Sequence, residues 1–246
     1  MPCTCWTEDI WRAIHILALT STFKQNEEKV AFCTFIVSLN RIISCPEIEY
    51  TVCLFMSETD NDLINYIPTD TDDKKGSRER LFTWTYRLRE AVCKKLNTPI
   101  KKLHEMMDFY KKSTITKDVW GPCIWKLIHT TLLRLKMEDG VCTERMKQAG
   151  KAFMVCTCIL LPCIKCRSHC WEYYSTHDIN DYLDTNLHAF EWSVEFHNAV
   201  TERTNLENGY KRRTYTPQEA LLIYAQVPDN KSFLECKFVA DKCTKK

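Results

Sequence analysis

Two cysteines, Cys163 and Cys166, stand at a spacing that supports thiol chemistry. Pro162 directly precedes them, and proline is favoured at the first turn of a helix, so the pair is predicted to open a helix. At such a position, unpaired backbone N–H groups and the positive end of the helix dipole favour the reactive thiolate. From the spacing alone, three alternatives stay open: a structural disulfide, half of a zinc site, or a redox pair.

The neighbouring residues bear on these alternatives. Structural zinc sites usually join two ligand pairs across a loop, and a thioredoxin-like pair would need a βαβ context, which the sequence lacks. Here the candidate ligands crowd into one stretch, namely Cys156, Cys158, Cys163, Cys166, His169 and Cys170. The pattern favours a redox pair, with Cys156 and Cys158 packing as small apolar side chains. A zinc-stabilised module that binds protein or nucleic acid without catalysis is the alternative.

Aromatic and imidazole side chains accompany the dithiol. Trp125 and His129 stand four residues apart and therefore share one face of a predicted helix, while Trp192 and His197 lie on a later helix. Taken singly, each would ordinarily be a core residue. Together with His169, one turn beyond the dithiol, they offer flat aromatic surface and polar groups. A planar, partly polar cofactor needs such a surface, whereas a metal ion does not.

The composition limits the fold and the function. Glycine occurs only 5 times in 246 residues, which disfavours turn-rich β folds and favours helices. No glycine-rich Rossmann or P-loop motif is present, and the net charge of +2 predicts no strong attraction to nucleic acid or acidic lipid. We expect no membrane span, because no apolar run approaches the roughly 18 residues required. No signal peptide is visible, so 15 cysteines indicate metal ligation, thiol chemistry or a special redox niche.

The elements that would position these residues are helices. Apolar residues recur at helical spacing, as at Ile124, Leu127 and Ile128, and we predict about ten helices and no strand. Two stretches also repeat in order. The segment 6–15 matches 120–129 at an offset of 114 residues, and 82–92 matches 190–200 at an offset of 108. These matches predict an ancient duplication that divides the chain near residue 112.

The two predicted halves are not equivalent. Where the second half carries the Cys163–Cys166 motif, the first reads Cys45-Pro46-Glu47-Ile48-Glu49-Tyr50 and has no such pair. Where the second carries His197 and Asn198, the first carries Arg89 and Glu90. A half that retains apolar and tryptophan positions but loses the polar constellation is predicted to be a scaffold.

Taken in order, the motifs of the second half resemble the Erv/ALR family of flavin-linked sulfhydryl oxidases. They are Trp120-Gly121, Trp125 and His129, then Pro162-Cys163-Ile-Lys-Cys166-Arg-Ser-His169, then Trp192 and Phe196-His197-Asn198-Ala-Val200. The resemblance covers residues 118 to about 206, with a degenerate echo in 4–97. Each piece is weakly specific, whereas the ordered set is strongly so.

The resemblance implies an all-α helical bundle that binds FAD and no metal. It implies a disulfide between Cys163 and Cys166, with Cys166 beside the isoalloxazine and Cys163 exchanging with protein thiols. Electrons would pass through FAD to molecular oxygen and give hydrogen peroxide. The cofactor-binding residues that it implies are Gly121, Trp125, His129, Cys166, His169, Trp192, His197, Asn198, Val200 and Thr201.

Two departures from the family pattern concern the nucleotide part of the site. The family usually has a second asparagine where Thr201 stands, and a lysine that the stretch 202–205 lacks. Arg203, or one residue of the basic triplet 211–213, is the candidate replacement. The triplet is otherwise ordinary solvated surface.

The resemblance also implies an organisation for the whole chain. Tandem Erv-like domains would form a single-chain pseudo-dimer, with a scaffold domain at 1–112, a catalytic domain at 113–210 and an extension at 211–246. A homodimer is also conceivable. A mobile relay dithiol could be Cys3 and Cys5 or Cys236 and Cys243, unless these are structural or reduced. The expected location is the host cytoplasm or nucleus and the virion for a viral protein, and otherwise the mitochondrial intermembrane space.

Overall fold

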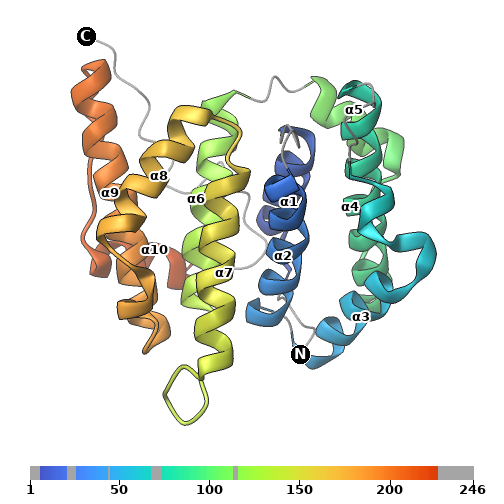
Figure 1. The fold of residues 1–246 in the computed structure, drawn as a ribbon, viewed down its shortest axis with the longest axis horizontal. Helices are drawn as coiled ribbons and strands as arrows, with labels where there is room; N and C mark the ends of the chain where they lie inside the picture. Colours follow the sequence, from blue (N-terminus) through green and yellow to red (C-terminus); the bar gives the residue numbers. More distant parts are fainter. Residues whose placement is uncertain (1–5, 21–25, 44, 68–73, 113–115, 227–246) are drawn as a thin grey trace.

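The chain folds into a bundle of α-helices (Figure 1). The computed structural model describes residues 6–20, 26–43, 45–67, 74–112 and 116–226, and within these ranges it contains helices and no β-strand. The predicted all-α class is therefore confirmed. The α-helices are α1 (Glu8–Thr20), α2 (Asn26–Ile43), α3 (Pro46–Ser57), α4 (Lys74–Leu96), α5 (Leu103–Lys112), α6 (Lys117–Leu133), α7 (Glu144–Leu160), α8 (Ile164–Thr176), α9 (Asn186–Asn208) and α10 (Pro217–Gln226). Short 3₁₀ helices are η1 (Thr59–Asn61), η2 (Leu63–Asn65) and η3 (Ile179–Tyr182).

Two groups of helices lie side by side in Figure 1, α1 to α5 on one side and α6 to α10 on the other. In the first group α4 packs against α1 and α3, and in the second α9 packs against α6 and α10. The groups meet where α2 packs along α7 and α1 packs against α6. One hydrophobic core runs through both groups, and Phe35 of α2 stacks on Phe153 of α7 with ring centroids 5.7 Å apart.

Helical spacing of apolar residues explains why these segments form helices and where they pack. In α1, Ile10, Ile14 and Leu17 lie on one face and are buried, as expected for one side of an amphipathic helix. Helix α9 ends at Gly209, whose φ of 66° is the left-handed conformation that glycine adopts at little cost. The long helices α6 and α9 can therefore present side chains to a common space between them.

Corresponding polar contacts recur in the two groups of helices. In the first, His15 Nδ1 lies 2.8 Å from Thr85 Oγ1, which links α1 to α4. In the second, His129 Nδ1 lies 2.7 Å from Ser193 Oγ, which links α6 to α9. Each hydroxyl donates to the carbonyl three residues earlier in its own helix. The repeated stretches of sequence thus make equivalent contacts.

The ring contacts around these histidines recur as well. Trp11 stacks on His15, and Trp125 stacks on His129. Tyr110 of α5 lies edge-on to His15 at 5.7 Å, and Tyr224 of α10 lies at 5.1 Å from His129, tilted by 59°. Helices α5 and α10 therefore hold similar places beside α1 and α6.

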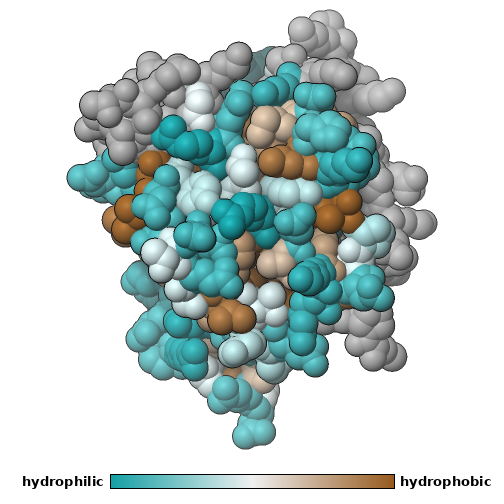
Figure 2. Space-filling view, turned by 90° about the vertical axis from the view of Figure 1, so that its right-hand side faces the viewer, coloured by the Kyte–Doolittle hydropathy of each residue, from teal (hydrophilic) through white to brown (hydrophobic). Residues whose placement is uncertain are grey.

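The surface of the first group of helices is mainly hydrophilic. Figure 2 shows this face, on which hydrophobic residues are scattered in small groups among hydrophilic ones. Isolated exposed apolar side chains are normal on a soluble domain. In the described part of the chain, no helix has both the length and the apolar character needed to cross a bilayer.

Candidate active site

The dithiol residues Cys163 and Cys166 are joined by a disulfide at the start of α8. Cys163 caps the helix, and its Sγ accepts a hydrogen bond from the backbone N of Cys166 at 3.2 Å. The prediction that the pair opens a helix is confirmed. Because a backbone N–H already points at the sulfur of Cys163, a negative charge that develops there is stabilised.

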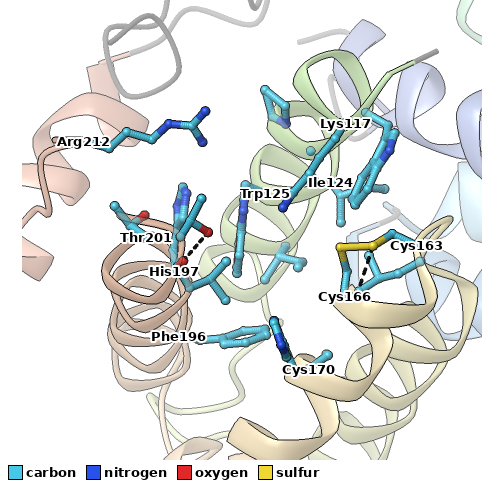
Figure 3. A pocket seen from close by; sticks show the side chains of 18 of the residues that line it. Lys117, Ile124, Trp125, Cys163, Cys166, Cys170, Phe196, His197, Thr201 and Arg212 are labelled. Atoms are coloured by element: carbon cyan, nitrogen blue, oxygen red, sulfur yellow. Dashed lines mark hydrogen bonds between the residues drawn. A yellow bond between two sulfur atoms is a disulfide. The ribbon is translucent and has the colours of Figure 1, made fainter. Parts of the chain in front are cut away.

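The disulfide faces a cavity of about 790 Å³ between α6, α8 and α9. Figure 3 shows the disulfide on one side of this cavity, with His197 and Thr201 of α9 on the other side and Trp125 of α6 between them. Apolar and aromatic side chains line the part near the sulfurs, including Ile124 and Phe196. The cavity therefore combines a redox-capable sulfur pair with flat apolar walls.

Most of the predicted site residues are brought together here. Those that line the cavity are Gly121, Trp125, Cys163, Cys166, His169, His197, Asn198, Val200 and Thr201. Trp125 stacks on His197 with centroids 4.1 Å apart and planes 10° from parallel, so the imidazole supports the indole from the side away from the disulfide (Figure 3). Sequence reasoning missed other lining residues, among them Trp120 and Phe196, although both lie inside the motifs that it used.

His129 and Trp192 were expected at the cofactor, but they lie behind the cavity wall. Both side chains are fully buried and neither lines the cavity. Trp192 packs against Phe196, and its Nε1–H donates to the carbonyl of His177 at 3.0 Å. The spacing of four residues correctly predicted that Trp125 and His129 share a helix face. It did not predict that His129 is buried deeper in the bundle than Trp125.

His129 instead belongs to a buried hydrogen-bond chain that reaches the wall. Ser193 Oγ donates to the Phe190 carbonyl at 2.6 Å, so it accepts from His129 Nδ1–H. His129 Nε2 then accepts from His197 Nδ1–H at 3.0 Å. Burial lowers the pKa of His129 to about 3 and that of His197 well below its usual value, so both rings are neutral. The chain of bonds leaves His197 Nε2 as a hydrogen-bond acceptor.

Because these imidazoles are buried, we expect the free energy of unfolding to fall as the pH is lowered. Burial also lowers the pKa of His15, so three imidazoles stay neutral in the folded chain but protonate near pH 6.5 when it unfolds. Below about pH 6.5 the unfolded state binds more protons, and the free energy of unfolding should fall by up to about 1.4 kcal/mol per pH unit for each ring. Urea unfolding between about pH 7.5 and pH 5.5 measures this effect, in a window where carboxylates stay ionised. A free energy of unfolding that is constant or rises as the pH falls would contradict it.

A cationic region lies on the other side of Trp125 from the disulfide, where Figure 3 labels Arg212. Arg212 and Arg213 both line the cavity, as does Lys117 at the start of α6. The predicted substitute Arg203 pairs with Glu172 at 3.0 Å and does not line the cavity. Arg212 and Arg213 also have acidic partners, Asp118 and Glu219, but both line it. Of the candidates for the missing lysine, the structure thus brings two members of the basic triplet to the site.

Two asparagines of α9 hold the segment that carries these arginines. Asn198 donates to the Tyr215 carbonyl at 2.7 Å and accepts from the Tyr215 N–H at 3.1 Å. Asn205 makes the same pair of bonds with the backbone of Arg212, at 2.8 and 3.0 Å. Each side chain acts as a backbone partner, so the segment between α9 and α10 is fixed along the cavity without regular secondary structure.

A second disulfide joins Cys158 of α7 to Cys170 of α8. Both Cys156 and Cys158 are buried in the core, as predicted, but the prediction that Cys158 packs there only as a small apolar side chain is wrong. Cys156 is a free cysteine, and burial raises the pKa of its thiol to about 11. Helical spacing places Cys170 one turn after Cys166, but it does not identify the partner of Cys170. The bond fixes α8 to α7.

Removing this second disulfide is expected to lower stability strongly. The two cysteines lie 12 residues apart. Closing a loop of this size lowers the conformational entropy of the unfolded chain, which stabilises the folded state by about 3 kcal/mol. The double variant Cys158→Ala with Cys170→Ala should lose free energy of unfolding by roughly that amount. Urea unfolding of the oxidised proteins measures the difference. An unchanged midpoint would show that the bond does not contribute to folding.

The corresponding place in the first group of helices is filled differently. Arg89 stands where α9 has His197, and its guanidinium lies 6.0 Å from the centroid of the Trp11 ring. Arg89 Nη1 donates to Glu8 Oε1 at 3.1 Å, so its charge is compensated there. Cys45 stands at the cap position of α3, as Cys163 does at α8. The residues seen here carry no disulfide at the start of α3.

Across the described ranges, no cluster of three or more His, Cys, Asp or Glu residues is arranged to hold a metal ion. The relay candidates Cys3, Cys5, Cys236 and Cys243 lie outside those ranges.

The fold and the site define an all-helical protein with a CxxC disulfide on an aromatic-walled cavity. Residues 122–218 match the model of the Erv1 / Alr family, which confirms the resemblance predicted from the motifs over this segment.

Two viral relatives are consistent with this resemblance, and the names of both give FAD-linked sulfhydryl oxidase as a provisional function. A protein of Frog virus 3 (isolate Goorha) is 27% identical over 105 residues, which are 43% of this chain and 65% of the relative. A protein of Invertebrate iridescent virus 3 is 24% identical over 92 residues, 37% of this chain and 60% of the relative. The chain thus spans less than two thirds of either relative. No solved structure matches significantly.

Proposed function

We propose that this protein is an FAD-dependent sulfhydryl oxidase that forms disulfides in protein thiols, with molecular oxygen as the electron acceptor. The observation that carries the proposal is the Cys163–Cys166 disulfide, which opens α8 and lines the aromatic cavity. The family match of residues 122–218 and the provisional names of the two viral relatives support it.

The residues of the cavity suit FAD. Its volume of about 790 Å³ lies within the range of roughly 300–1,000 Å³ that is usual for cofactor and ligand sites. The indole of Trp125, which is stacked on His197, offers a flat aromatic surface for a ring system. Arg212 and Arg213 offer guanidinium groups, which suit a diphosphate because they bind phosphate oxygens in pairs. FAD needs both kinds of partner.

The chain's own sulfurs perform the exchange. A substrate thiolate attacks Cys163 Sγ and displaces Cys166 as a thiolate, which gives a mixed disulfide between substrate and Cys163. A second substrate thiolate attacks the substrate sulfur, and a substrate disulfide leaves together with the Cys163 thiolate. The Cys166 N–H that points at Cys163 Sγ stabilises this leaving group. FAD, when bound, accepts the two electrons of the dithiol and supplies the path to oxygen, which becomes hydrogen peroxide.

Oxygen consumption with dithiothreitol tests the proposed activity. The purified protein should consume oxygen and form hydrogen peroxide in equal amounts, and it should release FAD when denatured. A flavin-binding scaffold would contain FAD but show no thiol-dependent oxygen uptake. A zinc-stabilised binding module would contain stoichiometric zinc and no flavin. Either of these results would contradict the proposal.

We also propose that the two groups of helices are duplicated Erv-like domains that form a single-chain pseudo-dimer, with a scaffold at 1–112, a catalytic unit at 113–210 and an extension from 211. The equivalent histidine–hydroxyl contacts His15–Thr85 and His129–Ser193 support this. The central packing of α2 along α7 supports it too, since a dimer interface would lie there. The viral relatives support a viral origin. Action in the host cytoplasm or nucleus and packaging in virions stay predictions. A homodimer of the whole chain and the relay dithiols stay predictions.

A further inference from the structure

Arg167, the residue after Cys166, connects the redox motif to two other parts of the molecule. Its Nε donates to the carbonyl of Leu161 at 2.6 Å, and its Nη1 pairs with Glu28. Its backbone N donates to the Cys163 carbonyl at 3.0 Å. Leu161 stands two residues before Cys163, so one side chain fixes both the segment that enters the motif and the first turn of α8.

The partner of Arg167 comes from the first group of helices. Glu28 lies in the first turn of α2, and its side chain is only 4% exposed, against 20% for that of Arg167. A buried carboxylate needs a compensating charge, because its desolvation is costly. Glu28 and Arg167 therefore constrain each other, and the scaffold side of the molecule contacts the redox helix directly through a charged pair.

The other contacts of helix α8 lie mainly along its middle and end, where Glu172 pairs with Arg203 of α9 at 3.0 Å and Tyr173 stacks on Phe196. The helix packs mainly against α7, to which the Cys158–Cys170 disulfide ties its middle. Near its start, Lys165 pairs with Glu207 of α9, but Lys165 is 65% exposed, and a surface pair of this kind contributes little. Cys163 and Cys166 pack on the core, and the polar contacts that hold the start of α8 to other segments are mainly those of Arg167.

We propose that Arg167, oriented by Glu28 of the first group of helices, is a positioning residue for the redox dithiol. The proposal rests on the sulfhydryl oxidase function and explains one contribution of the catalytically inactive half. Arg167 holds the turn 161–163 against the start of α8, which keeps the sulfurs of Cys163 and Cys166 together and Cys166 at the cavity. Two thiols held at bonding distance have a high effective concentration, which favours the disulfide and defines where electrons leave the dithiol.

Loss of the Arg167 contacts should change the reduction equilibrium of the disulfide and the rate of electron transfer from the dithiol in opposite senses. The Cys163–Cys166 disulfide becomes easier to reduce at equilibrium, because its two thiols are less well preorganised. The reduced dithiol nevertheless transfers its electrons more slowly, because Cys166 spends less time at the cavity. A residue that only stabilises the fold would not separate these two quantities in this way.

The experiment compares Arg167→Gln and Glu28→Gln with the wild-type holoenzyme. Anaerobic mixing with dithiothreitol gives the rate at which bound flavin is bleached, and thiol trapping in dithiothreitol redox buffers gives the reduction equilibrium of Cys163–Cys166. We expect Arg167→Gln to slow bleaching about tenfold or more at saturating dithiothreitol, and to shift the equilibrium toward dithiol by roughly tenfold. Glu28→Gln should shift both in the same direction by less. The double variant should match Arg167→Gln, because the two residues act as a unit.

A matched control is Glu49→Gln. Glu49 of α3 pairs with Lys136 at 3.1 Å and also links the two groups of helices, but away from the disulfide. It should leave the bleaching rate and the equilibrium unchanged. If Arg167→Gln does not fold, Arg167→Lys, which keeps the charge but cannot hold both partners in the same geometry, takes its place.

The outcomes separate the two proposals. Normal bleaching and a normal equilibrium in folded Arg167 variants would overturn the positioning role while the oxidase function stands. Equal changes in Glu49→Gln would overturn it as well, because they would indicate a general effect of inter-half contacts. Failure of dithiothreitol to bleach the wild-type flavin would overturn the oxidase function, and the positioning role with it.

Discussion

Replacing Cys163 or Cys166 with serine is expected to abolish thiol-dependent oxygen consumption, by about a thousandfold or more, while FAD stays bound. A serine hydroxyl cannot form a disulfide, so neither variant can accept electrons from a substrate thiol in the way that the Cys163–Cys166 pair can. The aromatic walls and the arginines are untouched, and the flavin site is therefore preserved. An oxygen electrode and the visible absorbance of the desalted protein measure the two properties.

Cys45→Ser is the matched control for this prediction. Cys45 caps α3 as Cys163 caps α8, so the same substitution is made at a comparable helix start. Unlike Cys163, Cys45 is not followed by a second cysteine three residues later. Serine is a favoured helix cap, and the variant should fold. It should retain wild-type oxygen consumption. Loss of turnover in folded Cys45→Ser would contradict the scaffold role of the first group of helices, and full activity of Cys166→Ser would contradict the proposed electron path.

Removal of the Trp125 ring is expected to weaken FAD binding about 10- to 100-fold, since stacking of a base or a similar ring on an aromatic side chain contributes roughly 1–3 kcal/mol. Trp125 lies between the disulfide and Arg212 in the cavity and stacks on His197 at 4.1 Å (Figure 3). Trp125→Ala removes the wall and also leaves His197 without its neighbour. Titration of the apoprotein with FAD, followed by flavin fluorescence, gives the dissociation constant.

Trp125→Phe keeps an aromatic face at this position and serves as the control. It should bind FAD nearly as well as the wild type, because most of the flat surface is retained. Thermal unfolding of both apoproteins shows whether a loss of binding is merely a loss of fold. Wild-type affinity in folded Trp125→Ala would show that the cavity wall does not hold the cofactor.

The helical class, the start of α8 and part of the cavity lining could be predicted from the sequence. These features depend on short stretches of sequence. Apolar periodicity determines which face of a helix is buried, and Pro162 marks where a helix can begin. The Trp125 and His197 motifs also carry a family pattern, which places residues of distant helices in one site. Such patterns supply the long-range contacts that spacing alone does not.

Other parts of the site depend on three-dimensional contacts that leave no periodic signal. His129 and Trp125 share a helix face, yet only the packing of α9 puts His129 in a buried hydrogen-bond chain instead of on the cavity. Arg212 reaches the cavity because Asn205 binds its backbone, and no spacing rule predicts that pair of bonds. Likewise, the partner of Cys170 could not be chosen among 15 cysteines without the geometry.

The absorption spectrum of the purified native protein, recorded before and after anaerobic addition of dithiothreitol, tests the central claim most directly. The account predicts a yellow protein whose flavin bands bleach with the thiol and return when oxygen is admitted, since the Cys163–Cys166 pair would pass electrons to a ring system held in the cavity. A colourless protein that contains stoichiometric zinc, or a flavin spectrum that dithiothreitol leaves unchanged, would contradict it.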